Sequence, residues 1–300
     1  MNYGQRSGVA DQIRSRGLMP IIAGVAALAV IGLLIFGISS CVRGCSNQAE
    51  TQQQATVGSA SGDGRVSASA SEALVKKLEP ALNRADAIQW IAKNTDRYPS
   101  EKIVQLAVDE PDAIDFVRAY PDADKSARAY GSDSIDSIPS VYDWDERWGN
   151  VDYNGLPLAV SGSGPTCLSM AYMGLNSKTD KTPADMAALA TNVGGAGGEA
   201  GTQGTFFTSV AGDLGLSINK LEDLSNDSIA GSITNTSPVL CQIKGSSFGH
   251  GPHWVLLIAC DAADNVTVYD PTCVEVTTRT WPMATITSSC AEAYLVYKAG

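Results

Sequence analysis

The sequence predicts an α+β fold that follows a single membrane-spanning helix and a flexible stalk. The first half of the region after residue 72 repeats apolar residues at three- and four-residue steps, which is typical of amphipathic helices. Later segments are short, rich in Val, Ile, Leu and aromatic residues, and bounded by Gly, Asp, Asn or Pro, which is typical of strands. Helices that come before strands favour an antiparallel sheet packed against helices.

An uncharged apolar run of 21 residues extends from Leu18 to Ile38. At about 1.5 Å per residue, a helix of that length crosses a hydrocarbon core of about 30 Å. Three arginines and one acid precede the run, so the positive-inside rule places residues 1–17 in the cytoplasm. We therefore predict a single-pass protein of the cell membrane, with a transmembrane helix over 18–40 and the C-terminal domain outside the cell.

Two other interpretations of the apolar run stay open. A cleaved secretory signal would have a shorter apolar core, of about 7–15 residues, followed by a small-residue cleavage site. The segment from Ile38 to Cys41 also resembles a bacterial lipobox, in which the cysteine is lipidated after cleavage. The domain would then be a lipoprotein anchored at Cys41 to the outer leaflet.

The exported part of the chain is acidic. Beyond residue 43 it contains 17 basic and 31 acidic residues, a net charge of −14. This charge argues against binding to nucleic acid or anionic lipid, and it favours a solvated surface with cationic peptide partners.

Five cysteines lie beyond residue 71 in the exported part, in a compartment where disulfides are allowed. The odd count leaves at least one thiol unpaired, and any four cysteines can pair in three ways. Sequence alone does not choose among these pairings for Cys167, Cys241, Cys260, Cys273 and Cys290.

Residues 41–71 are expected to form the stalk, because they are polar and contain few large apolar side chains. A helical accessory segment and linker follow over 72–137. Its first amphipathic pattern covers 72–94, where Pro80 is expected to kink or restart the helix. Shorter helical patterns follow at 101–108 and 111–120.

The main domain is expected over 138–300. Helical patterns fill its first part and strand patterns its second. We expect helices over 164–175, 183–192, 203–214 and 226–234, and strands over 239–243, 253–260, 266–269 and 293–298.

The segment from Ser161 to Cys167 places Ser163 between two glycines ahead of a predicted helix. Pro165 is favoured in a first helical turn, so Ser163 is expected at or just before the helix N-terminus. The unpaired N–H groups there stabilise a thiolate or a developing oxyanion. An ordinary N-cap serine explains the same segment. Cys167 is a second candidate nucleophile, although a buried core thiol is the ordinary explanation for it.

Two further residues could support such a nucleophile. His253 opens an apolar strand, and Asp270 ends the next one. If the two strands form a hairpin, both side chains lie at one end of it, as a base and its orienting carboxylate must. Each residue alone has an ordinary explanation, since Asp-Pro is a common turn signal.

These segments together resemble the motifs of family 39-like cysteine peptidases of the papain clan, the double-glycine-leader peptidase type. In that family the motifs read Gly-Cys-Gly-Pro-Thr, Gly-His-(Phe/Trp)-Val-Val and Asn-Asp-Pro. The segments that begin at Trp144 and Pro111 extend the resemblance to about residues 100–300. The resemblance implies a papain-like fold for 138–300, with N-terminal helices packed on an antiparallel sheet.

The resemblance also implies roles for four positions: a nucleophile at Ser163, a base at His253, an orienting acid at Asp270 and an oxyanion-supporting glutamine at Asp143. The chain departs from the family at two of them. A serine cannot form the thiolate–imidazolium pair of a papain-type site, and a carboxylate at position 143 would destabilise an oxyanion. We therefore predict a catalytically impaired domain, a pseudoenzyme, that binds a peptide or protein ligand at the cell surface.

Two other functions are compatible with the sequence. An active hydrolase would use Ser163 or Cys167 with His253 and Asp270, and a purely structural surface module would keep only a vestigial cleft. No cofactor is expected. A metal site is not expected either, because two histidines three residues apart without a nearby acid cluster make a poor zinc site.

Overall fold

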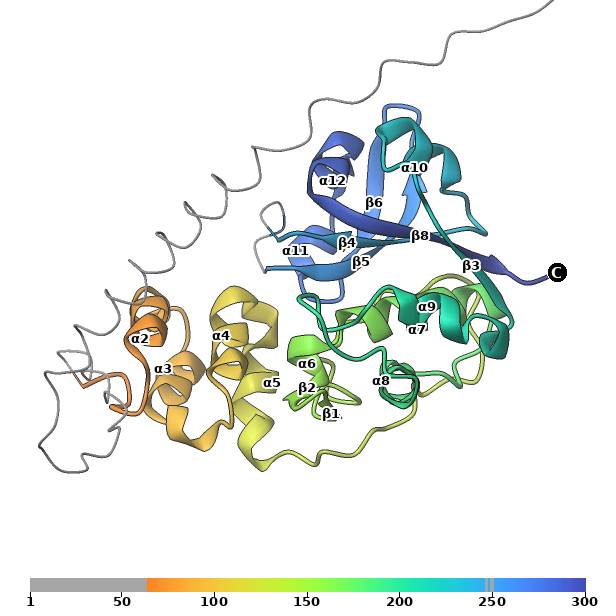
Figure 1. The fold of residues 1–300 in the computed structure, drawn as a ribbon. Coiled ribbons are helices and arrows are strands. Elements are labelled where there is room, and N and C mark those ends of the chain that lie inside the picture. Colours follow the sequence, from red (N-terminus) through yellow and green to blue (C-terminus); the bar gives the residue numbers. More distant parts are fainter. Residues whose placement is uncertain (1–63, 246–247, 249–250) are drawn as a thin grey trace, which may run out of the picture. The chain divides into compact units, whose positions relative to one another are not determined.

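The computed structural model describes residues 64–245, 248 and 251–300, which all belong to the compact unit Thr56–Gly300. The predicted cytoplasmic tail, membrane helix and lipobox, and most of the predicted stalk, lie outside these residues. Across the described ranges, no helix is both long and apolar enough to cross a membrane. The predicted combination of helices with an antiparallel sheet is confirmed (Figure 1).

Four short helices joined by 3-10 turns form the first part of the described chain. Two serines here cap the helices that follow them. The Ser71 side chain accepts a hydrogen bond from the N–H of Leu74, and the Ser100 side chain accepts one from the N–H of Lys102. Pro80 lies in a 3-10 turn, so the long helix expected over 72–94 is broken, because proline cannot donate to the helical ladder. The helices are α2 (Glu72–Leu78), α3 (Asp86–Lys93), α4 (Glu101–Asp109) and α5 (Ile114–Ala119), and the turns are η1 (Glu79–Ala81), η2 (Thr95–Arg97), η3 (Pro111–Ala113) and η4 (Tyr120–Asp122).

A six-stranded sheet in the order β3-β8-β4-β5-β6-β7 is the centre of the second part, and all its neighbouring strands are antiparallel. A two-stranded ribbon of β1 (Asp152–Tyr153) and β2 (Leu156–Pro157) lies earlier in the chain. The strands of the large sheet are β3 (Leu216–Lys220), β4 (Val239–Ile243), β5 (His253–Cys260), β6 (Asn265–Tyr269), β7 (Thr280–Pro282) and β8 (Cys290–Lys298).

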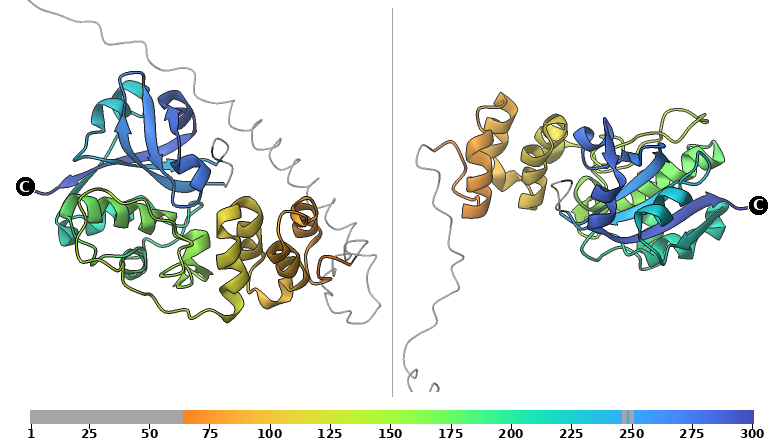
Figure 2. Two further views of the ribbon diagram at one scale, coloured as in Figure 1. Left: turned by 180° about the vertical axis from the view of Figure 1, so that it is seen from behind. Right: turned by 90° about the horizontal axis from the view of Figure 1, so that it is seen from above.

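Helices cover both faces of this sheet (Figures 1 and 2). Successive side chains of a strand point to opposite faces, and here both sets are buried. In β5, Trp254 and Leu256 belong to the core that includes α7, whereas Val255 and Leu257 belong to the core that includes α12. The helices are α6 (Leu158–Ser161), α7 (Ser163–Asn176), α8 (Pro183–Asn192), α9 (Thr205–Val210), α10 (Asn226–Ser232), α11 (Val274–Thr277) and α12 (Met283–Ser289), with a 3-10 turn η5 (Gly212–Leu214).

Some elements differ from the sequence-based expectations. The helix expected over 203–214 divides into α9 and η5, and β8 begins at Cys290, ahead of the expected strand. Strand β3 was not expected at all. It is a short edge strand, with only Leu216 and Ile218 buried, so its alternating pattern is too brief to separate from a loop.

Candidate active site

Ser163 is the first residue of α7, and Gly162 takes the N-cap position before it. The explanation of Ser163 as an N-cap is therefore wrong. Gly162 is required there, because a Cβ would lie 2.4 Å from Cγ of Leu158. The Ser163 Oγ atom instead accepts a hydrogen bond from the backbone N–H of Trp254 at 3.1 Å, which ties the start of α7 to the start of β5. Ser163 is only 4% exposed.

The hairpin of β5 and β6 brings His253 and Asp270 together, as the sequence predicts. The Nε2 atom of His253 lies 3.1 Å from Oδ2 of Asp270. The other ring nitrogen, Nδ1, lies 2.8 Å from the carbonyl oxygen of Gly251. Asp270 also accepts two hydrogen bonds from Thr272, from the backbone N–H at 2.8 Å and the hydroxyl at 2.7 Å. Both members of the pair are buried.

The partners of His253 determine its protonation. A carbonyl oxygen and a carboxylate can only accept, so each ring nitrogen must carry a proton to form these bonds. Burial on its own lowers the pKa of His253, but the charge of Asp270 and the hydrogen bonds to Asp270 and Gly251 outweigh it and raise the pKa. Burial likewise raises the pKa of Asp270, and the charge of His253 reverses this and lowers it. Both shifts favour the charged forms, an imidazolium paired with a carboxylate.

An imidazolium has no lone pair with which to accept a proton. A general base for Ser163 needs an unprotonated nitrogen within hydrogen-bond reach of Oγ. Among the described residues, no hydrogen bond joins Ser163 to His253, and the nitrogen that could face the serine donates to Gly251 instead. The geometry is therefore that of an ion pair beside a serine, without the proton transfer that a serine nucleophile requires.

Asp143 is fully buried and lies close to the same pair. Its backbone N–H donates to the carbonyl oxygen of Pro271 at 2.9 Å, directly after Asp270. Burial raises its pKa well above the ordinary value, and the charge of Asp270 adds to the increase. Its Oδ1 atom has no hydrogen-bond partner among the residues that the structure describes. Both causes favour the neutral carboxylic acid over the carboxylate that the sequence led us to expect, because two buried neighbouring acids cannot both ionise cheaply.

Cys167 lies one turn along α7 and belongs to the main core. Its thiol donates to the carbonyl oxygen of Trp254 at 3.4 Å. Burial raises its pKa well above the ordinary value, and the charges of Asp270 and Asp143 raise it further. A nucleophilic cysteine needs a lowered pKa and access to substrate, so the explanation as a core thiol holds for Cys167.

Sequence reasoning missed the backbone groups that complete the site. The Gly251 carbonyl and the Trp254 N–H carry no signal in a sequence, because every residue has these groups. It also missed Glu110, which is 3% exposed and accepts from the N–H of Val274 at 3.1 Å. This bond joins the accessory helices to the segment that follows Asp270. The position of Glu110 directly before Pro111, at the end of one helix and the start of the next turn, was the sequence feature that could have indicated it.

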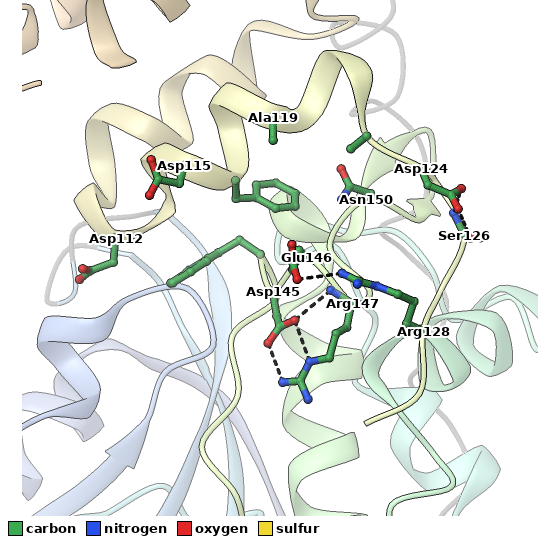
Figure 3. A pocket seen from close by; sticks show the side chains of 13 residues that line it. Asp112, Asp115, Ala119, Asp124, Ser126, Arg128, Asp145, Glu146, Arg147 and Asn150 are labelled. Atoms are coloured by element: carbon green, nitrogen blue, oxygen red, sulfur yellow. Dashed lines mark hydrogen bonds and ion pairs between the residues drawn. The ribbon is translucent and has the colours of Figure 1, made fainter. Parts of the chain in front are cut away.

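An open pocket of about 890 Å³ lies next to this site, where Trp144 follows Asp143. Figure 3 shows its acidic and basic side chains. Arg147 pairs with Asp145 at 2.6 and 2.9 Å, and Arg128 pairs with Glu146 at 3.0 Å. Asp112 and Asp115 complete the acidic side, and neither has a cationic partner in the described part of the chain. The full lining is Asp112, Asp115, Phe116, Ala119, Ala123, Asp124, Ser126, Arg128, Trp144, Asp145, Glu146, Arg147 and Asn150.

Two buried polar atoms of this pocket wall lack hydrogen-bond partners within the described ranges. They are Oδ1 of Asn150 and Nε1 of Trp144. Asn150 as a whole is 6% exposed. Buried polar atoms without partners are uncommon, because each loses its hydrogen bonds to water on burial. No group of three or more His, Cys, Asp or Glu residues in the described part of the chain is arranged to hold a metal ion.

Comparison with known proteins finds similar solved structures. No family model matches the chain, and no curated protein matches it. A similar solved structure is the peptidase domain of Streptococcus ComA, a bifunctional ABC transporter involved in a quorum-sensing pathway. It shares 16% sequence identity with this chain at a TM-score of 0.35, over 46% of this chain and 92% of that domain.

The protonation of Asp143 predicts a pH effect on stability. Its folded-state pKa lies above its unfolded-state value, so its contribution to stability is complete below about pH 4 and is lost as the pH rises toward the folded-state pKa. Asp143→Asn keeps the shape and removes the titration. We expect the variant to gain about 1–3 kcal/mol in unfolding free energy over the natural chain between pH 4 and pH 8.

Urea unfolding at both pH values measures this difference. Asp213→Asn is the matched control, because Asp213 is exposed and lies in η5. An Asp143→Asn difference that stays constant with pH would show that Asp143 is ionised in the folded chain.

Proposed function

We propose that this chain is a membrane-anchored peptidase family 39-like domain of papain-like fold that lacks efficient peptidase activity and acts outside the cytoplasm by binding a peptide or protein ligand. The apolar run and the arginines before it support the anchor, and the motifs around Ser163, His253 and Asp270 support the family. The observation that carries the loss of activity is the imidazolium of His253, held between Gly251 and Asp270 next to a serine.

A serine hydroxyl depends on a base more strongly than a thiol does, because it does not ionise at neutral pH. In this chain the partners of His253 favour its protonated form, and Ser163 Oγ accepts a hydrogen bond from the Trp254 N–H. Loss of general-base catalysis alone costs about 10²–10⁴ in rate. These features support a site that keeps the arrangement of a hydrolase without its chemistry.

The neutral carboxyl of Asp143 bears on the alternative of an active hydrolase. A neutral acid can donate one hydrogen bond to an oxyanion, as a glutamine amide does. Asp143 is therefore less damaging to catalysis than an ionised aspartate would be. The alternative that uses Ser163 then depends on whether His253 can lose a proton while it stays paired with Asp270.

The binding role we propose uses the pocket beside Asp143. Ser163 and His253 are each 4% exposed, so they offer a peptide little contact surface, whereas the pocket is open. Asp112 and Asp115 favour a cationic group, and aromatic rings of the lining can pack against its aliphatic stem. A lysine or arginine side chain of a basic peptide has all these features.

The first test concerns catalysis. We expect the full-length natural chain to hydrolyse no peptide detectably and to resist labelling by a fluorophosphonate, which attacks activated serines. We expect the double variant S163C/D143Q to become reactive toward iodoacetamide at position 163, because the imidazolium of His253 and the N-terminus of α7 stabilise a thiolate. Mass spectrometry locates the label.

The double variant S163A/D143Q is the matched control for labelling, since it keeps the other thiols and lacks the one at position 163. Peptide hydrolysis by the natural chain that disappears in Ser163→Ala would refute the proposed loss of activity and favour the active-hydrolase alternative.

The second test concerns the pocket. We expect D112N/D115N to weaken binding of a lysine- and arginine-rich peptide about fivefold, because each exposed ion pair contributes up to about 1 kcal/mol. Calorimetry or fluorescence anisotropy at low salt measures the dissociation constant, and the loss should shrink as salt rises.

A control variant, D213N/D227N, removes the same charge from exposed positions outside the pocket lining. Equal weakening by both double variants would mean that the peptide responds to net charge alone, and the pocket would not be the binding site.

A further inference from the structure

Two buried cysteines meet where strands β4 and β8 adjoin. Cys241 lies within β4 and Cys290 opens β8, and the two strands are antiparallel neighbours in the sheet. Their sulfur atoms are 3.1 Å apart, and the thiol of Cys241 donates to Cys290. Cys241 is completely buried and Cys290 is 7% exposed.

An irregularity in strand pairing brings the two side chains together. Cys241 pairs with Ala293, and Ile243 pairs with Cys290, with a register shift between Gln242 and Ile243. Diagonal neighbours on one sheet face normally lie about 7–8 Å apart, which is too far for a bond between short side chains. The shift inserts an extra residue into β8, and such bulges redirect the side chains beside them. Cys241 and Cys290 therefore belong to one core cluster.

We propose that Cys241 and Cys290 form a disulfide that links β4 to β8 when the chain meets a low-molecular-weight disulfide such as oxidised glutathione. The Cys290 thiolate attacks one glutathione sulfur, forms a mixed disulfide and releases one glutathione thiolate. The Cys241 sulfur then loses its proton, attacks Cys290 and releases the second. Two protein thiols are oxidised by two electrons, one glutathione disulfide is reduced, and the released thiolates take up the protons.

The environment of the pair fits this order of attack. The hydrogen bond from Cys241 lowers the pKa of Cys290, and the charge of Lys244 lowers it further. The same hydrogen bond is the largest cause that raises the pKa of Cys241. The attacking group is thus the thiol that is both more acidic and more exposed, as thiol–disulfide exchange favours.

The other described cysteines have different partners. Cys167 donates to the Trp254 carbonyl, and Cys260 lies next to the Asp261 carbonyl at 3.7 Å. Cys273 follows Asp270 closely and is buried near Glu110. Among these five cysteines the contacts therefore favour one cross-link, between Cys241 and Cys290, with Cys167, Cys260 and Cys273 as thiols.

The cross-link would enclose the part of the chain that carries the candidate site. Residues 242–289 lie between the two cysteines, and they include both His253 and Asp270. The backbone N–H of Lys244 donates to the carbonyl of Ser289 at 2.9 Å, at the same strand ends. A disulfide here holds both ends of this segment together, and it stabilises the fold by restricting the unfolded chain.

Peptide mapping of the full-length chain tests the link. The protein is treated with oxidised glutathione, its remaining thiols are blocked with iodoacetamide, and it is digested with trypsin without reduction. Cleavage after Lys220, Lys244 and Arg279 places Cys241 in peptide 221–244 and Cys290 in peptide 280–298, apart from Cys260 and Cys273 in 245–279. We expect peptide 221–244 to be joined by a disulfide to peptide 280–298. The mass of the joined species should equal the sum of the two peptide masses less two hydrogen atoms.

Recovery of both peptides as alkylated thiols, as glutathione adducts or joined to 245–279 would overturn the proposal.

A second measurement uses thermal stability. We expect a phosphine reductant to lower the melting temperature by roughly 5–10 °C in the natural chain and in Cys260→Ser, and to leave C241S/C290S unchanged. If C241S/C290S does not fold, the peptide map of the natural chain still decides.

Discussion

The arrangement of the candidate site depends on the imidazolium of His253, which is held between the Gly251 carbonyl and the Asp270 carboxylate. A buried charge is tolerated only when it is paired and hydrogen-bonded, and these two acceptors satisfy both ring nitrogens. The same pairing joins the start of β5 to the end of β6. Ser163 is not part of this pairing, and its Oγ atom accepts a hydrogen bond from the Trp254 N–H. Removal of either charge would leave the other buried without a partner, which typically lowers the free energy of unfolding by about 3–5 kcal/mol.

The ionised pair also determines what its neighbours can be. Asp143 lies beside Asp270 in the interior, where burial and the charge of Asp270 raise its pKa and favour the protonated form. Cys167 is influenced by both acids and stays a thiol. Glu110 reaches the same region from the accessory helices and accepts from the Val274 N–H. Burial, with the charge of Asp270 beside it, therefore raises the pKa of both Asp143 and Cys167.

The sequence predicted the residue types and strands of this site well. The positions of α7, β4 and β5, and the meeting of His253 with Asp270, followed from periodicity and from a hairpin argument. The protonation states did not follow, because they depend on burial and on backbone carbonyls such as that of Gly251. Burial and the charge of Asp270 raise the pKa of Asp143, and neither is visible in a sequence. The contact between Cys241 and Cys290 also lay beyond sequence, since it depends on a register shift that no pattern encodes.

The protonation of His253 tests this account most directly. The chain has two histidines, so His250→Gln leaves one whose ring nitrogens can be followed by nitrogen-15 NMR. The account predicts that Nδ1 and Nε2 both carry protons at pH 7 and that the ring titrates above about pH 6.5. An unprotonated Nδ1 at pH 7 would contradict it, because His253 would then hold the free lone pair that an active serine at position 163 requires.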